Sequence, residues 1–143
     1  MALRGADLSP GQTHEAVVVD NLSRTQIVQY AGTSGDYNPL HSDEVFATKV
    51  AGYPSVFAHG MLTMGMTGRI LTDWVGDGRL LRYGVRFVKQ VWPGDTLTAR
   101  AEVTAVSVGE GAGPPPVAEF SVVTTNQHGA QVLVSTGAAR LDP

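Results

Sequence analysis

The 143-residue chain contains no cysteine. This absence excludes disulfide bonds, a thiolate nucleophile and any zinc or iron–sulfur site held by cysteine, and it is compatible with a reducing compartment. No run approaches the roughly 18 apolar residues of a membrane-spanning helix, and the first residues, MALRGADLSPGQ, lack the apolar core of a signal peptide. We therefore expect a cytoplasmic protein that does not enter a membrane.

An excess of positive charge is also absent. The chain has 10 lysines and arginines against 13 acidic residues, for a formal net charge of -3. Because nucleic-acid binding relies on basic surface, no nucleic-acid partner is expected. The remaining composition, 43% hydrophobic and 16% charged, is that of an ordinary globular protein. A chain of this length can bury its own core, so we expect a single domain over residues 1–143.

The first half of the chain predicts one strand followed by helices. Residues 13–19 are rich in β-branched side chains, which is typical of a strand. Ser23 and Gln26 have the spacing of a capping box and predict a helix over 24–33. A shorter helix is expected over 43–51, where acidic residues occupy the first turn.

Residues 58–76 predict a long helix inside the protein. Apolar side chains, including Met61, Met64 and Met66, are distributed around nearly all of its sides. Gly60 and Gly65 lower its helix propensity, a cost that makes sense where another backbone or a ligand must approach closely.

The second half of the chain has the alternating pattern of antiparallel strands. Leu81, Tyr83, Val85 and Phe87 are expected to share one face, and Ala105 to continue the apolar face of the next strand. The expected strands are 81–88, 97–105, 118–125 and 130–140, with a surface loop at 109–116. The pattern predicts an α+β domain in which an antiparallel sheet of about five strands wraps around the long helix. Pairing of its free edges with a second copy would give a homodimer.

The segment SGDYNPLH, residues 34–41, admits two interpretations. Ser, Gly, Asp, Asn and Pro are the residues that end helices and form turns, so a connecting loop would use the same composition. However, Asp36 and His41 lie five positions apart across a bend fixed by proline, where both side chains can point at one place. A carboxylate and an imidazole together form a general acid/base pair near neutral pH.

This segment resembles the signature of the MaoC-like dehydratases, the (R)-specific enoyl-CoA hydratases of the hot-dog fold. The resemblance runs essentially from end to end of the chain. The matching positions are Tyr30, Ser34, Gly35, Asp36, Asn38, Pro39, Leu40, His41 and Ala47, and Thr33 departs from the aliphatic residue usual there. Two further stretches agree: Ala58-His59-Gly60-Met61, and Pro93-Gly94-Asp95-Thr96-Leu97 after Arg86-Phe87. The chain is also similar to the dehydratase subunit of mycobacterial-type fatty-acid elongation.

The resemblance implies an enzyme of fatty acid metabolism that adds water reversibly to a trans-2-enoyl thioester and forms the (R)-3-hydroxyacyl thioester. It implies no cofactor and no metal. Asp36 and His41 would share the catalytic water, and the backbone N–H of Gly60 would bind the thioester oxygen. Further candidates are Ser34, Asn38 and His59 as supports of the site, and Tyr30, Met61, Met64 and Arg86 as contacts to the acyl chain or CoA. The methionines are expected first of all in the core, with the lining of an acyl tunnel as the alternative. The order of proton transfers, the chain length and the choice between CoA and a carrier protein stay open.

Other interpretations of the same residues are weaker. His41, Asp43 and His59 could ligate a metal, but neither their spacing nor a fourth ligand is compelling. Gly60 and Gly65 have the spacing of a phosphate loop without its lysine. Arg82, Arg86 and Lys89 either attract the phosphates of CoA or lie on a solvated sheet face. A hot-dog thioesterase and a heterodimer with a related chain, in which this chain is the catalytic half, are the alternative functions.

Overall fold

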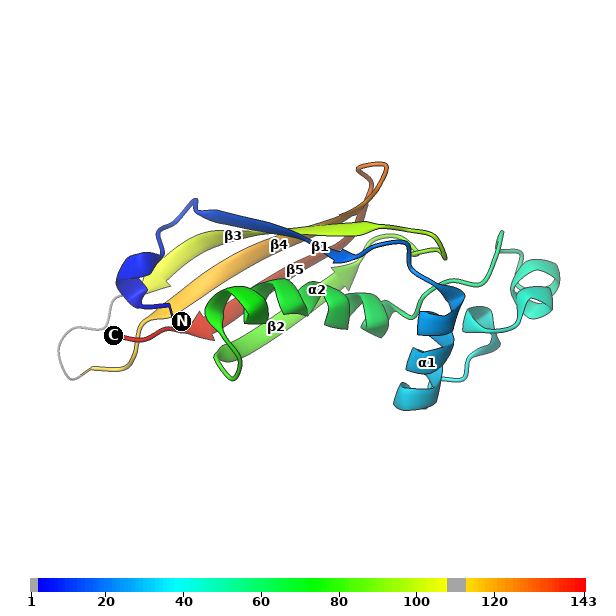
Figure 1. Ribbon diagram of the computed structural model, residues 1–143, viewed down its shortest axis with the longest axis horizontal. Helices are drawn as coiled ribbons and strands as arrows, with labels where there is room; N and C mark the ends of the chain where they lie inside the picture. Colours follow the sequence, from blue (N-terminus) through cyan, green and yellow to red (C-terminus); the bar gives the residue numbers. More distant parts are fainter. Residues whose placement is uncertain (1–2, 108–112) are drawn as a thin grey trace.

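The computed structural model describes residues 3–107 and 113–143, in which a five-stranded antiparallel sheet packs on one helix (Figure 1). The strands are β1 (Thr13–Val19), β2 (Leu80–Phe87), β3 (Leu97–Ser107), β4 (Val117–Asn126) and β5 (Gln131–Arg140), and their order is β1-β3-β4-β5-β2. β1 and β2 are therefore the edges. No described helix is long and apolar enough to span a membrane. Part of the predicted 109–116 loop, residues 109–112, lies outside the described residues.

Helix α2 (Gly60–Val75) lies along the sheet and confirms the predicted central helix (Figure 1). Its buried residues are Thr63, Thr67, Gly68, Ile70, Leu71 and Val75. The expectation that this helix lies wholly inside the protein is wrong, because Arg69 and Asp73 are exposed and Met61 is 56% exposed. The sheet covers only one side of α2, so the other side of the helix faces outward.

Helix α1 (Arg24–Ser34) begins with the predicted capping box, in which Ser23 and Gln26 each bond the backbone of the other. It ends at Gly35, whose φ of 77° is favourable only for glycine and a few polar residues. The next segment contains a 3₁₀ turn, η2 (Pro39–His41), and a π-helical turn, η3 (Phe46–Val50). The α-helix predicted over 43–51 is thus wrong in type, because the Ala51 N–H donates to the Phe46 carbonyl five residues earlier.

Two predicted inward positions are wrong because of β-bulges. The register of β2 against β5 shifts between Leu80 and Arg82, and Leu81 is 60% exposed. The register of β3 against β4 shifts between Val103 and Ala105, and Ala105 is exposed. An extra residue on one strand changes the face on which its neighbours lie, which simple alternation does not reveal.

The core consists of two clusters. One lies between the C-terminal half of α2 and the sheet and includes Leu71, Phe120 and Val122. The other joins α1 and the segment before α2 to the sheet through Leu22, Ile27, Ala58, Val91, Leu97, Val132 and Leu133. Through this second cluster, α1, the start of α2 and the end of the sheet are held in one rigid packing arrangement.

Candidate active site

The loop after α1 is held by three consecutive hydrogen bonds from backbone to side chain. The Asp36 N–H donates to Ser34 Oγ at 3.2 Å, the Asn38 N–H to Asp36 Oδ1 at 3.3 Å, and the Leu40 N–H to Asn38 Oδ1 at 3.0 Å. Each side chain thus fixes the backbone two residues later, as Ser, Asp and Asn do in turns. The geometry suits the supporting roles expected for Ser34 and Asn38.

His41 is 9% exposed and its ring orientation is fixed. Its Nδ1 lies 2.7 Å from the carbonyl oxygen of Phe57. A carbonyl can only accept, so Nδ1 carries the proton and Nε2 has a free lone pair. The Phe57 ring also packs edge-on against the imidazole, with ring centroids 5.3 Å apart. Phe57 was not identifiable from the residue pattern, because the atom that bonds His41 belongs to its backbone.

A third side chain, His59, joins the two predicted catalytic residues. A carboxylate oxygen of Asp36 and one ring nitrogen each of His41 and His59 lie within 4.8 Å of one another. The Asp36 carboxylate is exposed, whereas His59 is buried. Asp36 and His41, five apart in the chain, therefore meet at one point, close enough for one water molecule to bridge them.

The surroundings of His41 favour its neutral form. Burial lowers the pKa of this imidazole below its ordinary value of 6.5, and the nearby His59 ring acts in the same direction. The Phe57 carbonyl and the Asp36 carboxylate raise the pKa, but the lowering effects are larger. His41 can therefore accept a proton at neutral pH.

The N-terminus of α2 supplies hydrogen-bond donors beside this pair. His59 is the residue before the helix and makes no side-chain cap. Among the hydrogen bonds of the described residues, none uses the N–H of Gly60 or of Met61, whereas the next two N–H groups donate to the His59 carbonyl. Free N–H groups at a helix start bind negative charge. They suit the oxyanion role expected for Gly60 and add Met61 as a second donor.

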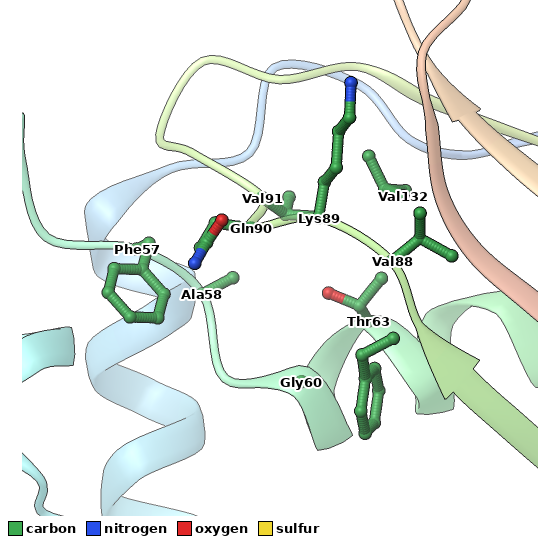
Figure 2. A pocket seen from close by; sticks show the side chains of 10 residues that line it. Phe57, Ala58, Gly60, Thr63, Val88, Lys89, Gln90, Val91 and Val132 are labelled. Atoms are coloured by element: carbon green, nitrogen blue, oxygen red, sulfur yellow. The ribbon is translucent and has the colours of Figure 1, made fainter. Parts of the chain in front are cut away.

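A cavity of about 280 Å³ opens beside Gly60 (Figure 2). Its walls are mostly apolar and include Phe87 and Val132, while Thr63, Lys89 and Gln90 contribute polar atoms. A methyl group at position 60 would lie 3.1 Å from the Phe87 ring, so a larger residue there would have to displace that ring at the cavity wall.

The predicted contact residues are distributed over different places. Tyr30 lies against His59, with ring centroids 4.8 Å apart. Met61 is exposed at the start of α2, and Met64 packs partly buried in the core. Arg86 lines a separate depression on the sheet, together with Ser121 and Thr136, and not the cavity beside Gly60.

Of the other basic residues considered for phosphate binding, Arg82 forms an ion pair with Glu119 on the sheet. Lys89 lines the cavity, and its ammonium extends away from Gly60 (Figure 2).

The three clustered donors are poorly arranged for joint metal binding. The rings of His41 and His59 are stacked at 3.8 Å with an interplanar angle of 27°. Since each lone pair lies in its ring plane, stacked rings do not direct both at one point. Asp43, considered as a ligand from the sequence, instead accepts the N–H of Phe46.

The chain matches the MaoC like domain model over residues 6–119. It belongs to this family. The R-hydratase PhaJ1 from Pseudomonas aeruginosa has the same fold, with a TM-score of 0.83, 25% identity, and 99% of this chain and 86% of that chain covered. A Mycobacterium tuberculosis protein described as a double hotdog fold superposes with a TM-score of 0.81, 25% identity, and 99% and 44% of the two chains covered. The hot-dog fold and the family expected from the sequence are confirmed.

Among curated proteins, this MaoC-like chain is similar to the 3-hydroxyacyl-thioester dehydratase Y of Mycobacterium tuberculosis. The two are 47% identical over 68 residues, which cover 46% of this chain and 23% of the relative. The probable enoyl-CoA hydratase 2 of Dictyostelium discoideum is 30% identical over 132 residues, 90% of this chain and 41% of the relative. The chain spans less than half the length of the curated relatives it matches.

Proposed function

We propose that this chain catalyses the reversible hydration of trans-2-enoyl thioesters to (R)-3-hydroxyacyl thioesters. The observation that carries the proposal is the meeting of Asp36 and His41 beside the free N–H groups at the start of α2. The names of its relatives, which are dehydratases and enoyl-CoA hydratases, support the same chemistry. Part of this proposal is that residues 1–143 act as one cytoplasmic MaoC-like domain.

The catalytic water would lie between the Asp36 carboxylate and Nε2 of His41. Asp36 accepts one of its hydrogens and orients it, while the free Nε2 lone pair removes the other proton as the water oxygen bonds to C3 of the enoyl group. The electrons of the C2–C3 double bond shift toward the thioester oxygen. The protonated imidazole then returns the same proton to C2 on the same face, which restores neutral His41 and gives syn addition.

The negative charge that develops on the thioester oxygen needs preorganised donors. The N–H groups of Gly60 and Met61 are free for this purpose, and they lie at the positive end of a helix of 16 residues. Because the carbonyl of Asp36 bonds His59, the residue immediately before Gly60, the acid/base pair and these donors are parts of one site.

The substrate would use the cavity beside Gly60. The mixed lining of Thr63, Gln90 and apolar side chains is compatible with a thioester substrate, and Lys89 offers a positive charge for a phosphate. Both acyl-CoA and an acyl carrier protein present such a group, and both stay in the proposal.

The deciding experiment follows the loss of enoyl-thioester absorbance when purified protein meets crotonyl-CoA and then a long-chain trans-2-enoyl-CoA. Chiral analysis of the product should give the (R)-alcohol. Release of free CoA without a hydroxyacyl product would contradict hydration and indicate a thioesterase. Absence of any reaction with both CoA and carrier-protein substrates would contradict activity of the isolated chain.

The rate of hydration is expected to stay high below pH 6.5 and to fall only as the pH is lowered further. Burial lowers the pKa of His41, and a base works only while it is neutral, so the loss of activity follows this lowered pKa. The measurement is kcat/KM from about pH 5 to 8, with circular dichroism as a control for unfolding. An acidic limb centred at or above 6.5 would contradict His41 as the base.

We further propose that the chain is a homodimer formed through an edge of the sheet. β2 is an edge strand, and Leu81, Phe87 and Val88 leave apolar surface exposed along it and just beyond its end. Unpaired strand edges and apolar surface are covered in stable assemblies. A second copy there would also lie beside Phe87 in the cavity wall. Light scattering should give twice the chain mass; a monomer that gains activity with a related chain would favour the heterodimer.

A further inference from the structure

His59 contacts both members of the acid/base pair without being one of them. It is 2% exposed, and its Nε2 lies 3.0 Å from the backbone carbonyl oxygen of Asp36. Its ring is stacked on that of His41, with centroids 3.8 Å apart. Tyr30, from α1, packs against the same ring. One buried side chain thus bonds the backbone of the carboxylate residue and covers a face of the imidazole.

The hydrogen bond to Asp36 defines which nitrogen of His59 carries the proton. A carbonyl oxygen only accepts, so the proton is on Nε2 and the lone pair is on Nδ1. Nδ1 is buried and has no hydrogen-bond partner. An unpaired buried polar atom costs free energy, and a phenylalanine here would avoid that cost. The compensating feature of histidine is that one flat ring combines an N–H donor with a stacking face.

We propose that His59 is a positioning residue, whose N–H holds the backbone of Asp36 and whose ring holds the His41 imidazole with Nε2 toward the Asp36 carboxylate. This inference rests on the proposed function, because it assigns a purpose to the geometry of that acid/base pair. It differs from a contact to substrate, since the hydrogen bond of the His59 side chain goes to Asp36 and its ring stacks on His41, the two residues of the proposed acid/base pair.

The groups around His41 set the pKa of its imidazole in the free protein, before any substrate binds. The groups that influence its protonation are Asp36 from the loop, His59 from the start of α2 and the carbonyl of Phe57, while Tyr30 reaches only as far as His59. After burial, His59 is the neighbour that lowers the pKa of His41, whereas Asp36 and the Phe57 carbonyl raise it. The His59 ring also covers one face of the His41 imidazole, so removing it lets water reach that face and raises the pKa of His41.

Two variants separate the two contacts. His59→Gln keeps an N–H donor for the Asp36 carbonyl but removes the ring, and His59→Phe keeps a ring against His41 but removes the donor. Each is expected to lower kcat about tenfold with KM changed less than about twofold, because each loosens one constraint on the reacting pair. Combining His59→Phe with His41→Ala should lower kcat no more than about twofold beyond His41→Ala alone, since His59 acts through that pair.

Nuclear magnetic resonance of the ring nitrogens tests the contact without substrate. The expected spectrum has the proton of His41 on Nδ1 and that of His59 on Nε2, and His59→Gln should move the titration midpoint of His41 to higher pH. His14→Phe is the matched control, because His14 also packs against an aromatic ring, that of Trp74 with ring centroids 5.2 Å apart, and is not part of the site. It should change neither kcat nor the His41 titration.

Three results would overturn the inference: unchanged kcat in both His59 variants, a raised KM with kcat intact, or an unmoved His41 midpoint in a folded His59→Gln protein. A moved midpoint in a protein whose wild type hydrates no enoyl thioester would instead reject the proposed function while supporting the contact between the two histidines.

Discussion

Asp36→Asn and His41→Ala are each expected to lower kcat for enoyl-thioester hydration by at least about a hundredfold. The asparagine cannot serve as the negatively charged acceptor that orients the water. The alanine removes the only nitrogen of residue 41 that is free to take its proton, since Nδ1 is bonded to the Phe57 carbonyl. The rates are measured with crotonyl-CoA at saturating concentration, so that kcat is separated from binding.

Matched controls for these variants lie outside the site. Asp73→Asn changes an exposed carboxylate on the outward side of α2, where its partner is Arg69, and should retain the wild-type rate. His14→Phe serves the same purpose for the histidine. Thermal melting checks that Asp36→Asn and His41→Ala remain folded. A wild-type rate in either folded site variant would refute the assignment of that residue.

Leu71→Ala is expected to destabilise the protein by about 2–5 kcal/mol. Leu71 is fully buried in the larger core cluster, so its truncation removes apolar contacts and leaves a cavity between α2 and the sheet.

Gly137→Ala on β5 is expected to destabilise the protein by about 1–3 kcal/mol, because it adds a methyl group where the core has no room for one. A methyl group at that position would lie 2.7 Å from Leu71 Cδ1.

The combination of these two changes gives a sharper test of the packing. Shortening Leu71 removes the atom that a methyl group at position 137 would meet, so the double variant should lose less stability than the sum of the two single variants. Urea unfolding provides the three free energies. A strictly additive double variant would show that Leu71 and Gly137 are not in the contact that the structure describes.

Local sequence patterns predicted most of the secondary structure because the signals were local too. The capping box of Ser23 and Gln26 and the alternation in β4 and β5 depend on neighbours within a few residues. The predictions for Leu81 and Ala105 were wrong where the pairing of two distant strands inserted a bulge. The helix predicted over 43–51 was wrong in type because the same residues suit an α-helical and a π-helical turn. The packing of the turn decides which hydrogen bonds form.

The candidate site also contains residues that local patterns predicted and residues that only the fold revealed. Asp36 and His41 were identifiable from residue type, spacing and family signature, and the supporting bonds of Ser34 and Asn38 follow from the known turn preferences of those residues. Phe57 was missed because its contribution is a carbonyl oxygen, and Arg86 was expected near the substrate although it lies along a different depression of the sheet.

By itself the sequence determined the family and the order of the elements, and it pointed to the two side chains that we propose as the acid/base pair, since all of these follow from local patterns and residue types. Only the tertiary structure decided that the 34–41 loop lies against the start of α2, with His59 bonded to Asp36 and stacked on His41. The physical reason is that the protonation of His41 depends on burial and on neighbours 16 and 18 positions away along the chain, Phe57 and His59. Folding of the core brings those groups together, and no short stretch of sequence specifies their arrangement around His41.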